Sequence, residues 1–195
     1  MSDIKQFAKE NHVPIILDGG LDFLIKTIKS RDVKDILELG TAIGYSAINM
    51  ARQNQEIKID TIERNEEMYK EAVLNVKEAN LENQINLHFM DVEEFKTDKM
   101  YDLIFVDAAK SQYYKFLNMF IDNLKDDGIM VFDNMEFHGL VDHPELTNNR
   151  NTRQLVRKIK NFRELVQEDE RFDIIMYEGV GDGIMTLTRR RHIWS

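Results

Sequence analysis

The chain has 195 residues, a length that one globular domain fills, so we expect residues 1–195 to form a single domain with one site. Hydrophobic residues make up 43% of the chain and charged residues 31%, and no apolar run is long enough to span a membrane, which predicts a cytoplasmic protein. The net charge of −9 argues against non-specific coating of nucleic acid, and zero cysteines exclude disulfides, thiolate zinc sites and cysteine nucleophiles.

Short apolar runs alternate with longer segments of helical spacing, which is typical of a mostly parallel sheet with helices on both faces. Strands are predicted at residues 35–39, 57–62, 85–89, 103–106 and 129–132. Helices are predicted from about residue 45 and over residues 65–80, 113–124 and 150–167. Residues 174–177 and 184–188 predict an antiparallel hairpin, whereas residues 133–149 predict a long functional loop. The pattern therefore predicts a Rossmann-like α/β fold with seven strands.

The first predicted strand runs into a glycine turn, Glu38-Leu-Gly-Thr-Ala-Ile-Gly-Tyr-Ser46, which opens a helix at about Tyr45. Glycine lets the backbone approach a ligand closely, and the free N–H groups at a helix start attract a negative oxygen. The spacing Gly40-x-x-x-Gly44 lacks the third glycine of a dinucleotide fingerprint. The turn therefore argues against an NAD-dependent dehydrogenase and favours a ligand with a nucleoside and a carboxylate.

Two further strand ends carry acidic residues that suit a nucleoside. Glu63 ends the second predicted strand, 23 residues after Gly40, where a carboxylate can accept both hydroxyls of a ribose. Asp91 and Val92 follow the third strand, from which they can reach an adenine edge. Each acid alone could be a helix cap or a solvated loop residue. Their order behind the glycine turn favours a nucleoside site.

Oxygen ligands follow the next two strands, in Asp107-Ala-Ala-Lys110 and in Asp133-Asn134. Such a set suits Mg²⁺, which leaves coordination positions open for two adjacent substrate oxygens. A cation of this kind lowers the pKa of a substrate hydroxyl, whose oxyanion can then attack the methyl group of a sulfonium. Lys110 is placed to accept the proton as a general base, although a solvated surface lysine is the alternative.

These motifs resemble the catechol-type, metal-dependent O-methyltransferase family of class I methyltransferases over most of the chain. Within the family, four segments resemble the bacterial tRNA 5-hydroxyuridine methyltransferases: Val13-Pro-Ile-Ile16, Thr41-Ala-Ile-Gly-Tyr-Ser46, Asp107-Ala-Ala-Lys-Ser-Gln-Tyr113 and Asp133-Asn-Met-Glu-Phe-His-Gly-Leu-Val141. The resemblance implies S-adenosylmethionine and Mg²⁺ as cofactors, with Lys110 as the base. It implies metal ligation by Asp107, Asp133 and Asn134. Together with Gly40 of the turn, the expected cofactor contacts are Ile16, Ser46, Glu63, Asp91, Val92 and Asp107.

The resemblance also implies a substrate, 5-hydroxyuridine at the tRNA wobble position, which methylation converts to 5-methoxyuridine. Its 5-oxygen lies beside the 4-carbonyl oxygen, so it can chelate a metal as a catechol does; a small catechol-like or vicinal diol substrate is the alternative. Six basic residues and no acidic one lie between Arg150 and Arg163, and Arg189 to Arg191 are also basic. This run is either a solvated helix face or a contact for the phosphates of an anticodon loop. A non-enzymatic nucleoside-binding module would leave the oxygen ligands and Lys110 without a role.

Only twelve residues precede Val13, so the N-terminal helix that is usual in the family is expected to be short. The resemblance implies a homodimer, whose details this short segment leaves open. The five histidines are scattered, and none is expected to bind the metal. His138 is interpreted as an ordinary loop residue, with a position at the substrate mouth as the alternative.

Overall fold

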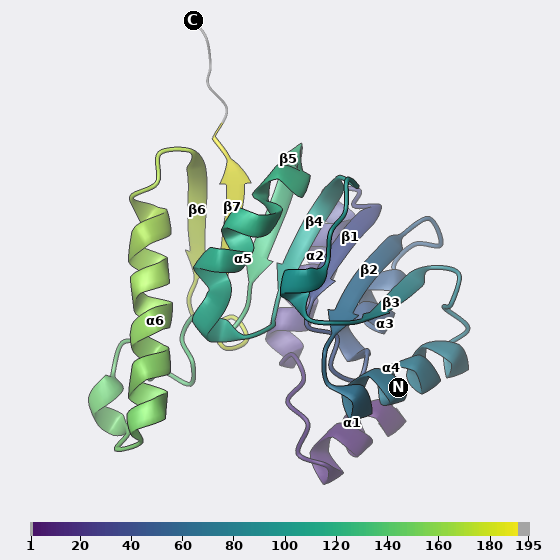
Figure 1. Ribbon diagram of the computed structural model, residues 1–195, viewed down its shortest axis with the longest axis horizontal. Coiled ribbons are helices and arrows are strands. Elements are labelled where there is room, and N and C mark those ends of the chain that lie inside the picture. Colours follow the sequence, from purple (N-terminus) through teal and green to yellow (C-terminus); the bar gives the residue numbers. More distant parts are fainter. Residues whose placement is uncertain (1, 191–195) are drawn as a thin grey trace, which may run out of the picture.

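A computed structural model describes residues 2–190 and contains a seven-stranded sheet in the order β3-β2-β1-β4-β5-β7-β6 (Figure 1). Five strands run parallel: β1 (Asp35–Leu39), β2 (Lys58–Glu63), β3 (Ile85–Phe89), β4 (Tyr101–Val106) and β5 (Leu124–Phe132). β7 (Ile184–Arg189) pairs antiparallel with β5 and with β6 (Phe172–Tyr177). The predicted fold class and C-terminal hairpin are confirmed. Arg191, the last residue of the predicted basic tail, lies outside the described residues.

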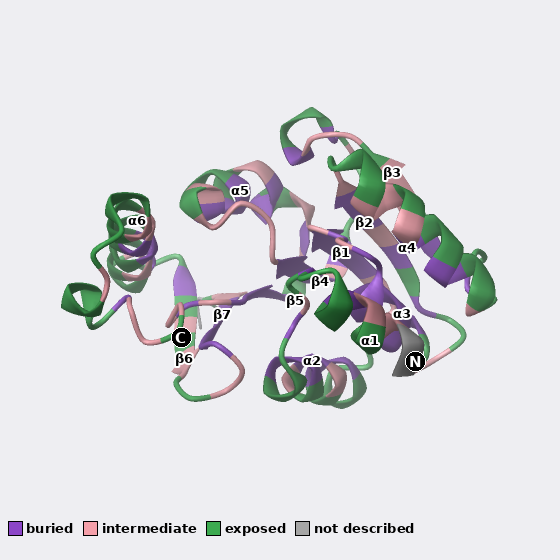
Figure 2. Ribbon diagram, turned by 90° about the horizontal axis from the view of Figure 1, so that it is seen from below, coloured by how far each residue is buried: buried purple, intermediate pink, exposed green. Residues whose placement is uncertain are grey.

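Helices cover both faces of the sheet (Figure 2). α2 (Asp18–Ser30) and α3 (Tyr45–Ala51) pack on one face, and α5 (Tyr113–Phe120) and α6 (Arg150–Gln167) pack on the other. α4 (Glu66–Glu78) contacts β2 and β3, and α1 (Ser2–Glu10) lies beyond the carboxyl ends of the parallel strands. Short 3₁₀ turns are η1 (Val92–Glu94), η2 (Lys110–Gln112), η3 (Ile121–Asn123) and η4 (Pro144–Leu146). No helix within residues 2–190 is both long enough and apolar enough to cross a membrane.

The core consists of two apolar layers, one on each face of the sheet. Successive strand residues point to opposite faces, so Ile36 joins the layer beneath α2 and α3 while Leu37 joins the layer beneath α5 and α6. In the second layer the Phe132 and Phe162 rings lie 5.0 Å apart between centroids. The buried Tyr113 hydroxyl donates to the Asp133 carbonyl oxygen at 2.9 Å. The core therefore fixes the end of β5, where the predicted site begins.

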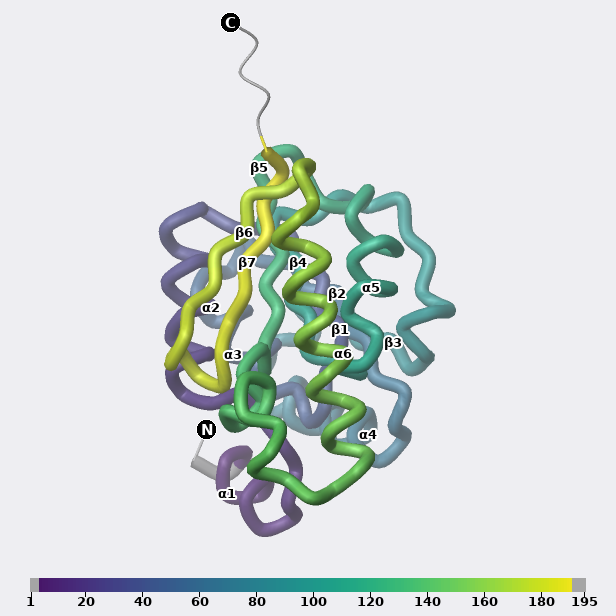
Figure 3. Tube along the Cα trace, turned by 90° about the vertical axis from the view of Figure 1, so that its left-hand side faces the viewer, coloured from purple at the N-terminus to yellow at the C-terminus, as the bar shows by residue number. Residues whose placement is uncertain are grey.

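α6 is an amphipathic helix with a defined start. The Asn149 side chain caps it by accepting hydrogen bonds from the backbone amides of Asn151 and Thr152. Val156, Ile159, Phe162 and Val166 are buried against the sheet at helical spacing. The helix starts at the end of the molecule where α1 lies (Figure 3), and it packs against η2. Its first turns are therefore close to the carboxyl ends of the strands.

Three elements differ from the predictions. α2 was not predicted, although Leu21, Leu24 and Ile28 form a buried helical stripe, because Gly19 and Gly20 weaken the helical signal at its start. The helix predicted over residues 113–124 ends at Phe120, and β5 begins at Leu124 rather than at residue 129. Lys125, Asp126 and Asp127 interrupt the apolar run that would have revealed the longer strand.

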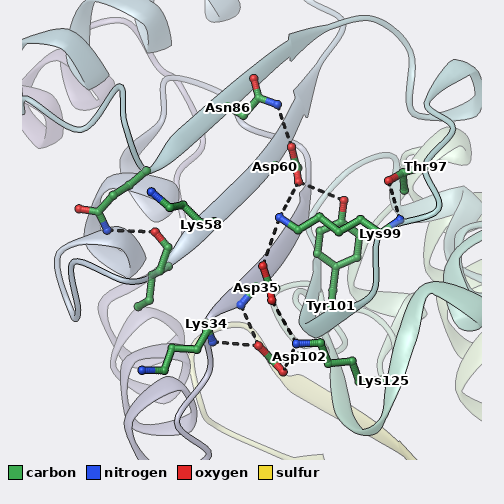
Figure 4. Close-up of polar contacts among 12 residues, drawn as sticks. Lys34, Asp35, Lys58, Asp60, Asn86, Thr97, Lys99, Tyr101, Asp102 and Lys125 are labelled. Carbon is green, nitrogen blue, oxygen red and sulfur yellow. Dashed lines mark hydrogen bonds and ion pairs between the residues drawn. The ribbon is translucent and has the colours of Figure 1, made fainter.

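A network of ion pairs joins the amino-terminal parts of four strands, at the far end of the sheet from α1 (Figure 4). The Lys99 ammonium lies 3.2 Å from an Asp35 oxygen and 3.3 Å from an Asp60 oxygen. The Lys125 ammonium lies 3.1 Å from Asp35 and 2.8 Å from Asp102. The network therefore links β1, β2, β4 and β5.

Asp60 is the most enclosed acid of this network, with a side chain that is 13% exposed. Burial raises its pKa, but hydrogen bonds with His88 and Asn86 and the charge of Lys99 outweigh burial, so the net pKa lies below the ordinary value. The Tyr101 hydroxyl also donates to Asp60, at 3.1 Å. Asp60 is therefore held as a carboxylate.

Candidate active site

A cavity of about 640 Å³ lies at the carboxyl ends of the parallel strands. Open α/β sheets bind ligands at this edge. All but one of the predicted site residues line it: Ile16, Gly40, Glu63, Asp91, Val92, Asp107, Lys110, Asp133 and Asn134. Ser46 does not line the cavity.

The glycine turn lies directly against the end of β4. Gly40 has a φ of +100°, and a Cβ at this position would lie 2.8 Å from the carbonyl oxygen of Asp107. A side chain here would therefore clash with the backbone of a predicted metal ligand. Gly44 has a φ of +83° and precedes the first residue of α3. The two glycines allow the turn to bring β1, α3 and β4 together at the cavity floor.

Glu63 is fixed at the end of β2 by two backbone amides. One carboxylate oxygen accepts from the amide of Ala42 at 2.8 Å, and the other accepts from the amide of Asn65 at 2.8 Å. Each carboxylate oxygen keeps a lone pair for a further donor. The Glu63 carboxylate can thus accept a hydrogen bond from a ligand hydroxyl while it stays bonded to the Ala42 amide of the glycine turn.

The Ser46 hydroxyl donates to the buried carboxyl group of Glu38, and the Thr61 hydroxyl donates to the other oxygen of the same group. Ser46 is 8% exposed and Glu38 is fully buried. Burial raises the pKa of Glu38 to about 8, although both hydroxyl groups lower it and the nearby Asp107 raises it further. Glu38 had no predicted role, because its place beneath the glycine turn emerges only from the fold.

Val92 begins η1 and Asp91 precedes it, on the adenine side of the predicted site. An Asp91 oxygen accepts from the amide of Glu93 at 3.0 Å, and Arg64 donates to the other oxygen at 3.1 Å. The Glu93 amide and the Arg64 guanidinium together hold the pKa of Asp91 below its ordinary value. The Asp91 carboxylate therefore caps η1 as well as lining the cavity.

The predicted oxygen ligands come together at the ends of β4 and β5. Asp133 is 3% exposed, and one of its oxygens accepts from the amide of Asn134 at 2.8 Å. Burial and the neighbouring Asp107 carboxylate raise the pKa of Asp133 to about 7. Burial also raises the pKa of Asp107, against the lowering effect of Lys110. The Lys110 ammonium lies 3.4 Å from an Asp107 oxygen.

The donor set consists of two carboxylates and one amide. Within residues 2–190, no three His, Asp or Glu side chains form a cluster suited to a metal ion. The chemistry of the set nevertheless fits a hard cation, because all three groups offer oxygen and the Asp107 carboxylate raises the pKa of Asp133. A cation between Asp107 and Asp133 would relieve that repulsion.

The fold adds lining residues that the sequence analysis passed over, chiefly Asp182 and Phe137. Asp182 lies in the loop between β6 and β7 and is 6% exposed. Phe137 packs on His138, with 5.4 Å between ring centroids, and both line the cavity although the His138 side chain is 72% exposed. The unusual Gly-Asp-Gly sequence at residues 181–183 was the available signal for Asp182. The sequence contained no comparable signal for Phe137, because its position depends on the conformation of the loop after β5.

The chain matches the O-methyltransferase family over residues 5–191. It is 32% identical over 181 residues to caffeoyl-CoA O-methyltransferase 2 of Populus trichocarpa, and 31% identical over 181 residues to the caffeoyl-CoA O-methyltransferase of Medicago sativa. Each alignment covers 86% of this chain and 71% of the relative.

Solved structures show the same fold. A Staphylococcus aureus protein, provisionally named a caffeoyl-CoA O-methyltransferase, has a TM-score of 0.92 at 34% identity over 97% of this chain and 91% of that chain. The methyltransferase PaMTH1 of Podospora anserina, bound to S-adenosylhomocysteine, has a TM-score of 0.78 at 25% identity over 88% of this chain and 78% of that chain. The chain thus belongs to the O-methyltransferase family and is an S-adenosylmethionine-dependent O-methyltransferase.

Proposed function

We propose that the protein is an Mg²⁺-dependent O-methyltransferase that converts 5-hydroxyuridine at the tRNA wobble position to 5-methoxyuridine. The observation that carries the proposal is the convergence of Asp107, Asp133 and Asn134 with Lys110 on one side of the cofactor cavity. Such a set selects a substrate with two adjacent oxygens, and 5-hydroxyuracil supplies them at its 4 and 5 positions.

In this proposal, S-adenosylmethionine lies along the carboxyl ends of β1, β2 and β4. Glu63 accepts the ribose hydroxyls, because its carboxylate is already fixed by two backbone amides. Asp91 and Val92 face the adenine, and the glycine turn at Gly40 and Ala42 receives the methionine portion. Ile16 covers the cavity from the segment before α2.

Asp107, Asp133 and Asn134 would hold Mg²⁺ through their oxygens. When bound, Mg²⁺ lowers the pKa of a coordinated substrate hydroxyl. Lys110, in its free amine form, would accept the hydroxyl proton at its Nζ, which lies 3.4 Å from an Asp107 oxygen. Phe137 and His138 form an aromatic side of the cavity against which a planar ring can stack.

The basic face of α6 supports an RNA substrate. Arg150, Arg153, Arg157, Lys158 and Lys160 are exposed on a protein that is otherwise strongly acidic. α6 packs against η2, which begins with Lys110, so the helix that carries these basic residues lies next to the element that carries the proposed base. Phosphates of an anticodon loop could contact α6 while a splayed base enters the cavity.

A small catechol-like or vicinal diol substrate is the second candidate. The names of the caffeoyl-CoA O-methyltransferases that this chain resembles do not single out such a substrate for it. The oxygen ligands and Lys110 suit both substrates, because a catechol also has two adjacent oxygens. The basic face of α6 has no role with a small neutral diol. The two candidates therefore differ in a surface that lies outside the reaction centre.

The deciding experiment offers labelled S-adenosylmethionine and Mg²⁺ with either a catechol or tRNA that carries unmethylated 5-hydroxyuridine. Controls contain EDTA or the variant Asp133→Ala. Transfer to the wobble uridine that both controls abolish supports the whole proposal. Transfer to the catechol alone rejects the tRNA substrate, and transfer that survives EDTA rejects the metal.

A further inference from the structure

Asp182 contacts the proposed metal site without being one of its proposed ligands. It is 6% exposed and comes from the loop between β6 and β7, far in sequence from the ends of β4 and β5. Its Oδ2 accepts from the Asn134 side-chain amide at 3.1 Å, and its Oδ1 accepts from the backbone amide of His138 at 2.6 Å. Burying a carboxylate costs free energy unless the group is hydrogen-bonded, and these two contacts supply that bonding.

The loop around Asp182 holds the segment after β5 at several points. The amide of Glu136 donates to the carbonyl oxygen of Asp182, and the amide of Met135 donates to that of Gly183, both at 2.9 Å. Gly183 has a φ of +79°, and a Cβ there would lie 2.5 Å from the Glu136 side chain. The backbone carrying Asn134 is therefore fixed without help from the Asp182 side chain.

The position of the Asn134 backbone does not determine which end of the side-chain amide faces the proposed metal ion. Its amide ends in an oxygen and an NH₂ group of similar shape, and only the oxygen can bind a cation. A carboxylate accepts hydrogen bonds but cannot donate them. The NH₂ end must consequently face Asp182, which turns the oxygen end away from it.

We propose that Asp182 is a positioning residue that selects which end of the Asn134 amide faces the metal ion. The inference rests on the proposed metal site. Partners of this kind fix the orientation of a ligand, and their loss typically weakens metal binding about 10-fold to 100-fold. Asp182 would act on metal affinity without touching the ion or the substrate.

The first test measures Mn²⁺ binding by titration calorimetry in Asp182→Asn. The new amide offers only one accepting oxygen for two donors, so Asn134 is free to turn its NH₂ end toward the ion. We expect binding about 10-fold to 100-fold weaker than in the wild type. The matched control is Asp142→Asn, which neutralises an exposed acid in the segment between β5 and α6 that pairs with Arg163. S-adenosylhomocysteine binding without metal should be unchanged in both variants.

A second test separates orientation from general loop structure. In Asn134→Asp the ligand has two equivalent oxygens and needs no orientation, so adding Asp182→Asn should then weaken Mn²⁺ binding by no more than about threefold. A loss of equal size in both backgrounds overturns the inference, as does unchanged binding in Asp182→Asn. A wild-type protein that binds no Mn²⁺ overturns the proposed metal function as well, so the two failures are distinguishable.

Discussion

Glu38 is a fully buried acid between two hydroxyl groups, and its pKa of about 8 makes stability depend on pH. The unfolded chain releases this proton near pH 4.5, whereas the folded protein keeps it until about pH 8. The free energy of unfolding should therefore fall as pH rises between these values, by up to about 1.4 kcal/mol per pH unit.

Glu38→Gln removes this contribution. Urea unfolding at pH 5 and at pH 8 should show a smaller loss of stability in Glu38→Gln than in the wild type. The exposed Glu82→Gln serves as the control and should follow the wild type. Parallel pH profiles for wild type and Glu38→Gln would show that Glu38 is already ionised in the folded protein.

Lys110 is the residue on which the proposed proton transfer depends. Lys110→Met should lower kcat about 10²-fold to 10⁴-fold, the range expected for loss of a general base. Binding of S-adenosylhomocysteine should persist, because the residues proposed for the nucleoside belong to other strand ends. Lys115→Met, which removes an exposed lysine paired with Glu93, is the matched control. Near-normal turnover by Lys110→Met with either substrate would exclude the proposed role.

The network at the amino ends of β1, β2, β4 and β5 should make the sheet sensitive to acid. The pKa of Asp60 and that of Asp102 lie below their ordinary values, so their contribution is present above the unfolded pKa and is lost as pH falls through the lower folded pKa. Asp60→Asn should therefore destabilise the protein at pH 7 by about 1–3 kcal/mol, and by much less near pH 3. The exposed Asp126→Asn should cost little at either pH. Equal destabilisation by Asp60→Asn at both values would contradict this account.

The proposed contact between the basic face of α6 and tRNA can be tested by reversing charges on this helix. Arg153→Glu combined with Arg157→Glu should reduce tRNA methylation strongly at low salt, while sparing a small catechol. The difference from the wild type should shrink as salt is raised, because salt weakens the phosphate contacts of the wild type. The same charge change on α2, Lys26→Glu with Lys29→Glu, places the new charges on the opposite face of the sheet and should have little effect. Equal loss of activity on tRNA and catechol would mean that the α6 variant disturbs the site itself.

The elements that were predictable from sequence are those whose signal is local. β1 and the glycine turn were predicted because a short apolar run leads directly into Gly40 and Gly44. The start of β5 was not, since it depends on pairing with β4 rather than on an apolar run. Asp182 was equally hidden, because its contact with Asn134 joins residues that meet only when β7 inserts beside β5.

At the scale of the whole molecule, the proposed metal ligands lie beyond the two apolar layers that hold the sheet and helices together. EDTA should therefore abolish methyl transfer without unfolding the protein. We expect the far-UV circular dichroism spectrum to persist and the melting temperature to change by no more than about 4 °C, which corresponds to about 1 kcal/mol at this size. Cooperative unfolding on addition of EDTA would instead identify a structural metal.

The order of strands in the sheet also sets an order of events during synthesis. β7 is the last strand along residues 2–190, yet it lies between β5 and β6 rather than at an edge. While the ribosome is still making the chain, β5 has an unpaired edge, and such edges promote aggregation. Asp182 lies two residues before β7, so the pairing of β7 with β5 and β6 completes the sheet and also brings Asp182 beside Asn134. A nascent chain that ends before Asp182 would therefore expose the unpaired edge of β5 and would lack the residue that contacts the Asn134 amide. The same incomplete chain would thus be prone to aggregation and would have an incomplete proposed metal site.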